Sequence, residues 1–484
     1  MKNKINVALI SSEVMPFSKT GGLADFSFGL SKALSELGCR VSVFSPLYAK
    51  TKENHSDIDL VKRNLKVEFG NWNNNYNLGY KKVKGLDFYF IEKDSYFDRV
   101  FLYGSSEGDY FDNAQRFAFF SGAVISSLKS FGCKPDIIHC NDWQTALVPF
   151  YLRHTISKSE FLKTKIMFTI HNLAYQGIFL RDVMPDIGIG HDFFNPESLE
   201  FYEKLNFMKS GIIYSDLITT VSPTYANEIL KDEFGCGLQG LLRSRNNYLY
   251  GILNGADYSH WDPGIDKFIR APYSHKSIEK KIICKIDLLR EFNMSLDQNK
   301  PLLGMVTRLT NQKGINIIVS AIEGIKKIGA RLVILGSGNK EYEDIINNLA
   351  SANPDIVSVK IGFDESIAHK IEAGSDIFLM PSNYEPCGLN QIYSLRYGTI
   401  PVVRAIGGLK DSIIDYTSDS QRGNGFAFDY ASSDSFLQAL ERAVCLYKDQ
   451  RAWSKLMKRN MKLDFSWCKT ARSYLNLYQK LIKN

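Results

Sequence analysis

Residues 6–37 read NVALISSEVMPFSKTGGLADFSFGLSKALSEL and combine the features that indicate the fold of this chain. A short apolar run, Asn6–Ser12, predicts a buried strand. A polar loop with a Gly-Gly turn follows, and Leu23–Leu37 then has the apolar spacing of an amphipathic helix. A strand, a glycine turn and a helix in this order are typical of a βα unit in a parallel sheet.

The same alternation recurs along the rest of the chain, with helical patterns such as Ala114–Lys129 between the strand-like runs. In the first half, further strands are predicted at residues 40–44, 136–140, 166–170, 217–221 and 248–252. In the second half, they are predicted at residues 302–307, 331–335, 357–361, 377–381 and 400–404. This pattern predicts the α/β class, with two doubly wound, Rossmann-like domains.

Turn-forming residues interrupt the alternation at Gly251–Gly264, which therefore marks the predicted domain boundary. Near the end of the chain, Asp464–Ile482 has the pattern of a capped amphipathic helix. We predict an N-terminal domain at 1–256, a second domain at 257–462 and a C-terminal helix within 463–484.

The composition is that of an ordinary globular protein, with 484 residues, 44% hydrophobic and 23% charged. The net charge of +7 is small for this length, and no basic tract with interleaved aromatic residues predicts binding to nucleic acid. No apolar run reaches the ~20 residues that a membrane span requires, and no secretory leader is expected before Ile5.

The cysteines are scattered, without a CxxC or Cys/His metal spacing, at positions 39, 133, 140, 236, 284, 387, 445 and 468. In a chain of this length such cysteines are typical of reduced thiols, which predicts a cytoplasmic protein. No metal ion and no other cofactor is expected.

Ligands of open parallel sheets bind beyond the carboxyl ends of the strands, and unusual polar residues follow several predicted strands. After the first strand come Lys19, the turn Gly21-Gly22 and a helix start, which together suit an anion. This loop has neither a GxGxxG nor a Walker sequence, so dinucleotide and NTPase sites are disfavoured. A plain turn at the start of a helix is the alternative.

Two further strands of the first half end at a titratable residue, Asp142 and His171. Taken singly, Asp142 could be a helix cap and His171 a buried structural histidine. Their shared position at strand ends favours a ligand site.

In the second half, Arg308 and Lys313 follow one strand and can together bind a diphosphate. The planar Arg guanidinium can donate two parallel hydrogen bonds, and the Lys ammonium acts as a point charge. A later strand leads into a polar loop with Glu385, which core packing does not require. Gly407-Gly408 forms another turn suited to an anion after the next strand.

Six segments resemble bacterial glycogen synthases and plant starch synthases: KTGGLAD (19–25), HNLAYQG (171–177), NGADYSHWDP (254–263), TRLTNQKG (307–314), YEPCGLNQIYSLRYGTIPVVR (384–404) and DFSW (464–467). The resemblance covers essentially the whole chain. It implies a retaining glucosyltransferase of GT-B architecture, with two Rossmann-like domains facing across a deep cleft. It also implies ADP-glucose as donor, an α-1,4-glucan such as glycogen as acceptor, and a C-terminal helix that packs back on the N-terminal domain.

The resemblance also implies roles for single residues. Those near the nucleotide sugar would be Lys19, Gly21 and Gly22 from the first domain, with Arg308 and Lys313 neutralising the diphosphate. Those near the glucosyl unit would be Glu385 and the backbone N–H groups of Cys387, Gly388 and Leu389. Tyr384 would lie near the adenine. The sugar and acceptor side would be lined by Asp25, Asp142, His171 and Asn254.

Two positions depart from related transferases. Tyr393 stands where many relatives carry a second acidic residue, a change that the synthases share. Ile406 stands before Gly407-Gly408 where many relatives carry Thr, which predicts weaker phosphate binding if that hydroxyl contributes.

A UDP-glucose-dependent transferase, or one with a small acceptor such as fructose-6-phosphate, stays open because base choice depends on a few loop contacts. A non-catalytic glucan-binding protein is disfavoured because it has no need of an unpaired basic pair at Arg308 and Lys313. A dehydrogenase is disfavoured because no GxGxxG is followed by an acidic residue about 20 positions later.

Overall fold

The chain divides into two compact units in the computed structural model, which describes residues 4–67, 75–105, 108–132, 134–155 and 161–483. The first unit comprises residues 1–221, 226–255 and 467–484, and the second comprises 222–225 and 256–466. Cys133, for which the sequence predicts a reduced thiol, lies outside the described residues. The other seven cysteines are free thiols.

The first unit is built on a nine-stranded sheet of order β14-β13-β9-β8-β1-β2-β5-β4-β3. Seven of these strands run parallel, whereas β4 pairs antiparallel with both β5 and β3. The strand bounds are β1 Asn6–Ile10, β2 Arg40–Pro46, β3 Asp59–Lys66, β4 Asn75–Val83, β5 Leu86–Glu92, β8 Ile137–Asn141, β9 Lys165–Ile170, β13 Leu217–Thr220 and β14 Leu249–Gly251.

Two small antiparallel sheets complete the strands of this unit. They contain β6 Gly104–Ser105, β7 Gly108–Asp109, β10 Ile178–Phe179, β11 Glu200–Phe201 and β12 Lys204–Asn206. The helices are α1 Gly22–Glu36, α2 Ala49–Asn54, α3 Asp94–Phe97, α4 Asn113–Ser130, α5 Leu147–His154, α6 Phe207–Tyr214, α8 Gln239–Ser244 and α18 Trp467–Lys483, with 3-10 turns η1 Trp143–Thr145, η2 Arg181–Val183, η3 His191–Phe193 and η4 Asn246–Tyr248. Helix α7, Pro223–Glu228, runs from the residues assigned to the second unit into the first.

The second unit has a six-stranded, fully parallel sheet of order β17-β16-β15-β18-β19-β20. Its strands are β15 Leu302–Leu309, β16 Arg331–Gly338, β17 Val357–Ile361, β18 Ile377–Met380, β19 Ile400–Arg404 and β20 Phe426–Phe428. Its helices are α9 Lys281–Glu291, α10 Ile315–Ser320, α11 Ile322–Ile328, α12 Lys340–Ala352, α13 Glu365–Gly374, α14 Asn390–Tyr397, α15 Gly407–Ser412, α16 Ser433–Lys448 and α17 Gln450–Asn460, with 3-10 turns η5 Ile278–Lys280 and η6 Asn311–Lys313.

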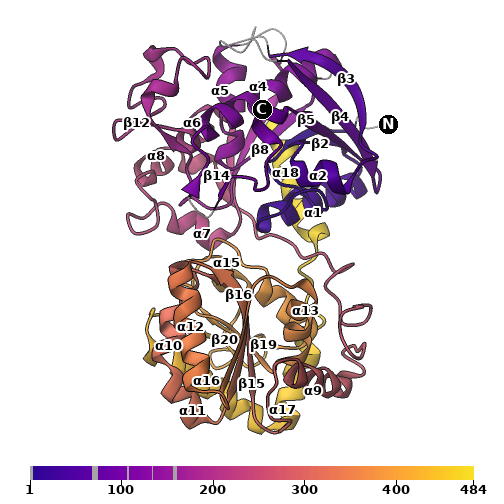
Figure 1. Ribbon diagram of the computed structural model, residues 1–484, viewed down its shortest axis with the longest axis vertical. Coiled ribbons are helices and arrows are strands. Elements are labelled where there is room, and N and C mark those ends of the chain that lie inside the picture. The colour runs from indigo at the N-terminus through magenta and orange to yellow at the C-terminus, as the bar shows by residue number, and fades with distance from the viewer. Residues whose placement is uncertain (1–3, 68–74, 106–107, 133, 156–160, 484) are drawn as a thin grey trace. The chain divides into compact units, whose positions relative to one another are not determined.

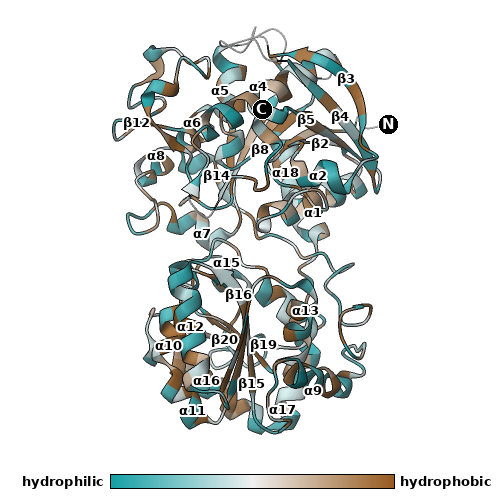
Figure 2. Cartoon of the chain, viewed as in Figure 1, coloured by the Kyte–Doolittle hydropathy of each residue, from teal (hydrophilic) through white to brown (hydrophobic). Residues whose placement is uncertain are grey.

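Helices cover both faces of this second sheet, with α10, α11, α12 and α16 along one face and α9 and α13 along the other (Figure 1). Apolar residues follow the strands, and polar residues lie on the outward sides of the helices (Figure 2). A parallel sheet that is covered on both faces needs such continuous apolar strands, which is why the sequence showed them so clearly.

Helix α18 belongs to the first unit although it ends the chain. Its residues Trp467, Tyr474 and Tyr478 lie in the same apolar core as strands β1 and β2. The Trp467 ring fills the space beside Gly29 of α1, where a Cβ would come within 2.2 Å of the indole nitrogen. Tyr478 also bonds the buried ring of His139 at 2.7 Å.

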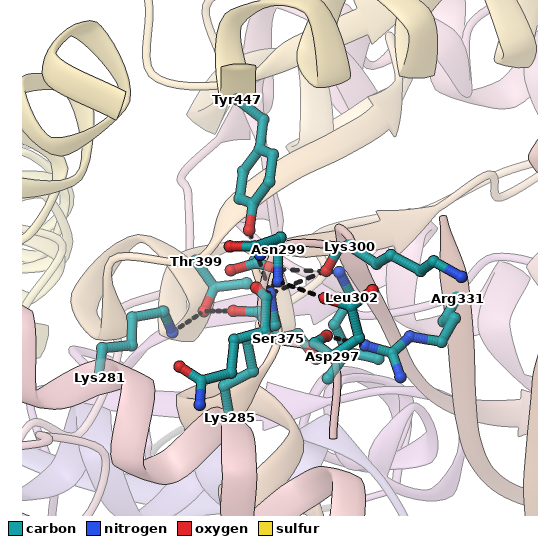
Figure 3. Close-up of polar contacts among 12 residues, drawn as sticks. Lys281, Lys285, Asp297, Asn299, Lys300, Leu302, Arg331, Ser375, Thr399 and Tyr447 are labelled. Atoms are coloured by element: carbon teal, nitrogen blue, oxygen red, sulfur yellow. Dashed lines mark hydrogen bonds and ion pairs between the residues drawn. The ribbon is translucent and has the colours of Figure 1, made fainter. Parts of the chain in front are cut away.

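A buried polar cluster lies at the amino ends of the second-unit strands (Figure 3). Lys285 of α9 donates to Asp376 at 2.7 Å, and the same carboxylate accepts the backbone N–H of Leu302, the first residue of β15. Lys281 donates to the Thr399 hydroxyl at 2.7 Å. The cluster therefore anchors α9 to the amino ends of the strands, on the opposite side of the sheet from the carboxyl ends of β15 and β18.

The two-sheet α/β class predicted from the sequence is confirmed, and the eleven predicted strands correspond to β1, β2, β8, β9, β13–β19. Strands β3, β4, β5 and β20 were not predicted. No described helix is both long enough and apolar enough to cross a membrane.

Candidate active site

The loop after β1 is held by the buried carboxylate of Glu13, a residue that the sequence reading missed. Glu13 accepts hydrogen bonds from the Thr20 backbone N–H at 2.5 Å, the Thr20 hydroxyl at 2.6 Å and the Gly21 N–H at 3.2 Å. The Tyr103 hydroxyl donates to it at 2.7 Å. One carboxylate thus fixes the whole path of the glycine turn, and its position directly after a strand was the available signal.

The glycine turn itself presents open backbone at the start of α1. Neither Gly21 nor Gly22 has an atom within 4 Å of where a Cβ would stand. Within the described segments no side chain caps the first turn of α1, so its N–H groups are available to an anion. Lys19 is ion-paired to Asp25 at 2.8 Å, which places these two predicted residues together.

Asp142 follows β8 in a backbone conformation that side chains rarely adopt, with φ 56° and ψ −179°. Such a conformation costs about 1–3 kcal/mol and is often found at functional sites. Asp142 does not cap the turn that follows, since its carboxylate accepts the backbone N–H of His171 at 2.7 Å. Burial raises the pKa of Asp142 to about 7, against the lowering effect of the His171 and Asn172 N–H groups.

His171 follows β9, the strand beside β8, so the structure brings it together with Asp142. Its Nε2 lies 3.0 Å from the side-chain oxygen of Asn141, and its ring packs edge-on against Phe26 of α1. Burial lowers the pKa of His171 to about 3, so the imidazole is neutral at physiological pH. A neutral ring can donate one hydrogen bond and accept another.

Asn254 is buried in the first unit, and its side-chain oxygen has no hydrogen-bond partner in the described part of the chain. A buried amide without a partner costs free energy that a bound hydroxyl can recover. This makes Asn254 a candidate for binding a polar ligand.

In the second unit, Arg308 lies near the carboxyl end of β15 and is exposed. Its guanidinium has no acceptor among residues 4–67, 75–105, 108–132, 134–155 and 161–483. Lys313 ends the short turn η6, and the chain then reverses at Gly314 with φ 69°. A Cβ at Gly314 would lie 2.0 Å from the Pro381 carbonyl oxygen, so glycine is required for this close approach to the end of β18.

Lys313 is not the unpaired cation that the sequence predicted. Its Nζ lies 2.6 Å from Glu385 Oε2, and both side chains are largely buried. The Ser382 hydroxyl donates to the same carboxylate oxygen at 3.0 Å. Of the predicted basic pair, only Arg308 is therefore free, because the turn at Gly314 directs Lys313 toward the loop that carries Glu385.

The loop after Glu385 leads into the start of α14, whose first turn is not capped by any side chain that the structure describes. The backbone N–H groups of Gly388 and Leu389 have no acceptor in the part of the chain that the structure describes. Next to them, Gly408 donates its N–H to the Glu385 carbonyl at 3.1 Å. A Cβ at Gly408 would lie 2.1 Å from the Cys387 carbonyl oxygen, so the two loops are in direct backbone contact.

The remaining predicted residues of this unit lie in the same two loops. Tyr384 is half-buried, and its carbonyl accepts from the Gln312 side chain at 3.2 Å. Gly407 begins α15, and Ile406 is buried before it. The predicted second-unit residues thus gather at the carboxyl edge of β15, β18 and β19, as expected for an open parallel sheet.

Comparisons with known proteins agree with this arrangement. Residues 6–244 match the family described as starch synthase catalytic domain, and residues 290–459 match glycosyl transferases group 1. A glycogen synthase of Koribacter versatilis is 46% identical over 98% of both chains. One of Syntrophotalea carbinolica is 42% identical over 99% of both.

Among solved structures, the catalytic domain of starch synthase IV from Arabidopsis thaliana, bound to ADP and acarbose, is similar with a TM-score of 0.90. It is 34% identical, and the similarity covers 100% of each chain. A sucrose-phosphate synthase from Thermosynechococcus elongatus shares the fold at a TM-score of 0.62 and 18% identity. Both α/β units match glycosyltransferase families, and the chain is more than 40% identical to glycogen synthases over nearly its full length. The chain therefore belongs to the glycogen synthase family of GT-B glycosyltransferases.

Proposed function

We propose that this glycosyltransferase moves the glucosyl unit of ADP-glucose to the non-reducing end of an α-1,4-glucan, with retention of configuration and release of ADP. The observation that carries the proposal is the pair of unbonded N–H groups at Gly388 and Leu389, beside the Lys313–Glu385 ion pair. Backbone donors without acceptors next to a fixed charge pair suit the hydroxyls and phosphate oxygens of a nucleotide sugar. The ADP bound in the similar starch synthase IV structure supports the choice of nucleotide.

Cleavage of the bond between glucose and phosphate develops negative charge on the departing ADP. The Arg308 guanidinium has no acceptor within the described part of the chain, and Lys313 is a second cation whose position the Glu385 carboxylate holds. In this proposal the two stabilise the diphosphate of the leaving group, without any metal ion or other cofactor. In the first unit, Lys19 and the open turn at Gly21 and Gly22 offer a cation and free backbone to an anionic ligand.

The acceptor is assigned to the strand ends of the first unit. The neutral His171 ring and the buried oxygen of Asn254 offer hydrogen bonds to sugar hydroxyls. Asp142, once ionised, accepts a hydrogen bond from a hydroxyl of the glucan or of the transferring sugar. Asp25 keeps Lys19 in place.

Retention without a covalent intermediate fits the state of Glu385. Retaining hydrolases use two carboxylates about 5 Å apart, one of them as a free nucleophile. Here the Glu385 carboxylate is bonded by Lys313 and Ser382, which lowers its nucleophilicity. We therefore favour front-face transfer, in which the departing phosphate accepts the proton of the attacking hydroxyl. The free thiols support a cytoplasmic location.

The test measures nucleotide release from ADP-glucose and from UDP-glucose, each with and without glycogen. The proposal expects ADP release that depends on glycogen, with the new linkage fully digestible by an α-1,4-specific amylase. R308A should lower kcat roughly 100-fold or more, the effect of removing one transition-state donor. The matched control is R451A, an exposed arginine on α17, which should retain activity. Preference for UDP-glucose, transfer to fructose-6-phosphate, or glucan binding without nucleotide release would each overturn the proposal.

A further inference from the structure

Three potential metal ligands cluster in the second unit, and none of them belongs to the loops described above. His260 comes from the loop between the two units' sequences, and Glu365 and His369 come from α13. One ligand atom of each lies within 4.8 Å of the others. Glu365 and His369 are four residues apart, so one turn of helix α13 presents both on one face. His260 Nε2 lies 2.9 Å from Glu365 Oε1.

His369 has the surroundings of an oriented metal ligand. Its side chain is fully buried, and Nδ1 lies 2.8 Å from Asp266 Oδ2. Its Nε2 is buried without a hydrogen-bond partner in the described chain. A carboxylate on one ring nitrogen with the other nitrogen left open is the arrangement that fixes ligating histidines in proteins. An ion at Nε2 would satisfy the nitrogen that the protein leaves unpaired.

The two rings are spaced as in a tetrahedral site. With metal–nitrogen bonds of about 2.0–2.1 Å, the centroids of two tetrahedrally placed imidazoles lie about 5 Å apart. The centroids of His260 and His369 are 5.0 Å apart, with an interplanar angle of 83°. The Glu365 carboxylate is exposed and His260 is half-exposed, so solvent can reach the cluster and a side-chain rotation can close the site.

We propose that His260, Glu365 and His369 bind a divalent transition-metal ion, with Zn²⁺ as the best match and water as the fourth ligand. Two imidazoles and one carboxylate are the ligands that Zn²⁺ takes, whereas Mg²⁺ and Ca²⁺ require oxygen ligands. This site lies outside the transfer chemistry, so it does not alter the expectation that the reaction itself uses no metal.

The ion would link the loop that carries His260 to α13, and the neighbouring Trp261 of this loop also contacts α14. Trp261 is stacked between the His369 ring, at 3.7 Å between centroids, and the Tyr393 ring, at 4.2 Å. Tyr393 belongs to α14, which begins directly after Leu389. Metal binding is therefore expected to raise the thermal stability of this unit.

The test uses the full-length protein after chelator treatment and dialysis against limiting Zn²⁺, with the metal content measured by mass spectrometry. Wild type should bind one ion per chain with a micromolar or lower dissociation constant, and Co²⁺ in its place should give the strong visible absorption of a tetrahedral complex. H260A and E365Q change only partly exposed side chains, so both should fold, and each should bind at least about 10-fold more weakly.

H275A is the matched control, since His275 is a half-exposed histidine of the same unit that the cluster does not include. It should bind Zn²⁺ as wild type does. The melting temperature of wild type and H275A, but not of H260A or E365Q, should rise on adding Zn²⁺. The proposal is overturned if wild type binds no ion at micromolar Zn²⁺, or if H260A and E365Q bind as tightly as wild type.

Discussion

The buried ion pair between Lys313 and Glu385 should stabilise the second unit as well as serve the reaction. At an effective dielectric constant of about 20, two unit charges 2.6 Å apart attract by about 6 kcal/mol, and desolvation offsets part of this. The substitution K313M keeps the apolar stem but leaves Glu385 as a buried, unpaired carboxylate. Because the Ser382 bond remains, we expect a cost near the lower end of the usual range, about 3 kcal/mol.

For a unit of this size that cost corresponds to a fall in melting temperature of roughly 6–12 °C. Differential scanning calorimetry is the suitable assay, because two units can unfold in separate transitions. The double variant K313M/E385Q removes both charges and should recover to within about 1 kcal/mol of wild type. Neither variant should be active, so stability and turnover report separately.

The matched control is K326A, which breaks the pair between Lys326 and Glu323. That pair has the same N···O distance, 2.6 Å, but is exposed on α11. An exposed pair contributes less than about 1 kcal/mol, so the melting temperature should fall by no more than about 4 °C. Equal shifts for K313M and K326A would refute the reasoning, as would a double variant that melts as low as K313M.

Three other predictions concern the site and its protonation. G408A should lower turnover by about 100-fold, because a Cβ 2.1 Å from the Cys387 carbonyl oxygen must displace the loop that carries Gly388 and Leu389. The control G240A replaces a helical glycine with open space around it and should keep the wild-type kcat. An active G408A would show that the loop tolerates displacement. If ionised Asp142 is required, kcat/KM should rise as the pH passes through about 7, and D142N should lack this limb; an unchanged limb in D142N would assign it to another group. Burial lowers the pKa of His139 from 6.5 to about 3, so on acidification the unfolded chain binds this proton before the folded chain does. The free energy of unfolding should therefore fall between pH 6.5 and pH 3, and the melting temperature of H139Q should fall less steeply over that range. Equal slopes for H139Q and wild type would contradict this.

The order of elements and the positions of the ligand loops could be predicted from the sequence. Strands such as β1, β8 and β15 are buried on both faces, so each is a continuous apolar run that single-sequence patterns reveal. Strand β3 is the edge strand and pairs antiparallel with β4. Both are rich in polar residues and contain no continuous apolar run, so the sequence pattern missed them. The turn at Gly407 and Gly408 was also predictable, because a positive φ at Gly407 and a close backbone approach at Gly408 favour glycine at these positions.

The partners of the charged side chains depended on the tertiary structure. The sequence places Arg308 and Lys313 five residues apart, yet Lys313 is paired with Glu385, 72 positions away. The Arg308 guanidinium, in contrast, has no acceptor among the residues that the structure describes. Glu13 had no local signal strong enough to show that it fixes the glycine turn. His260 and His369 are 109 positions apart, and only the packing of α13 against the His260 loop brings their rings together. Apolar periodicity is a local property and survives in the sequence, whereas ion pairs and ligand clusters join residues that only the folded chain makes neighbours.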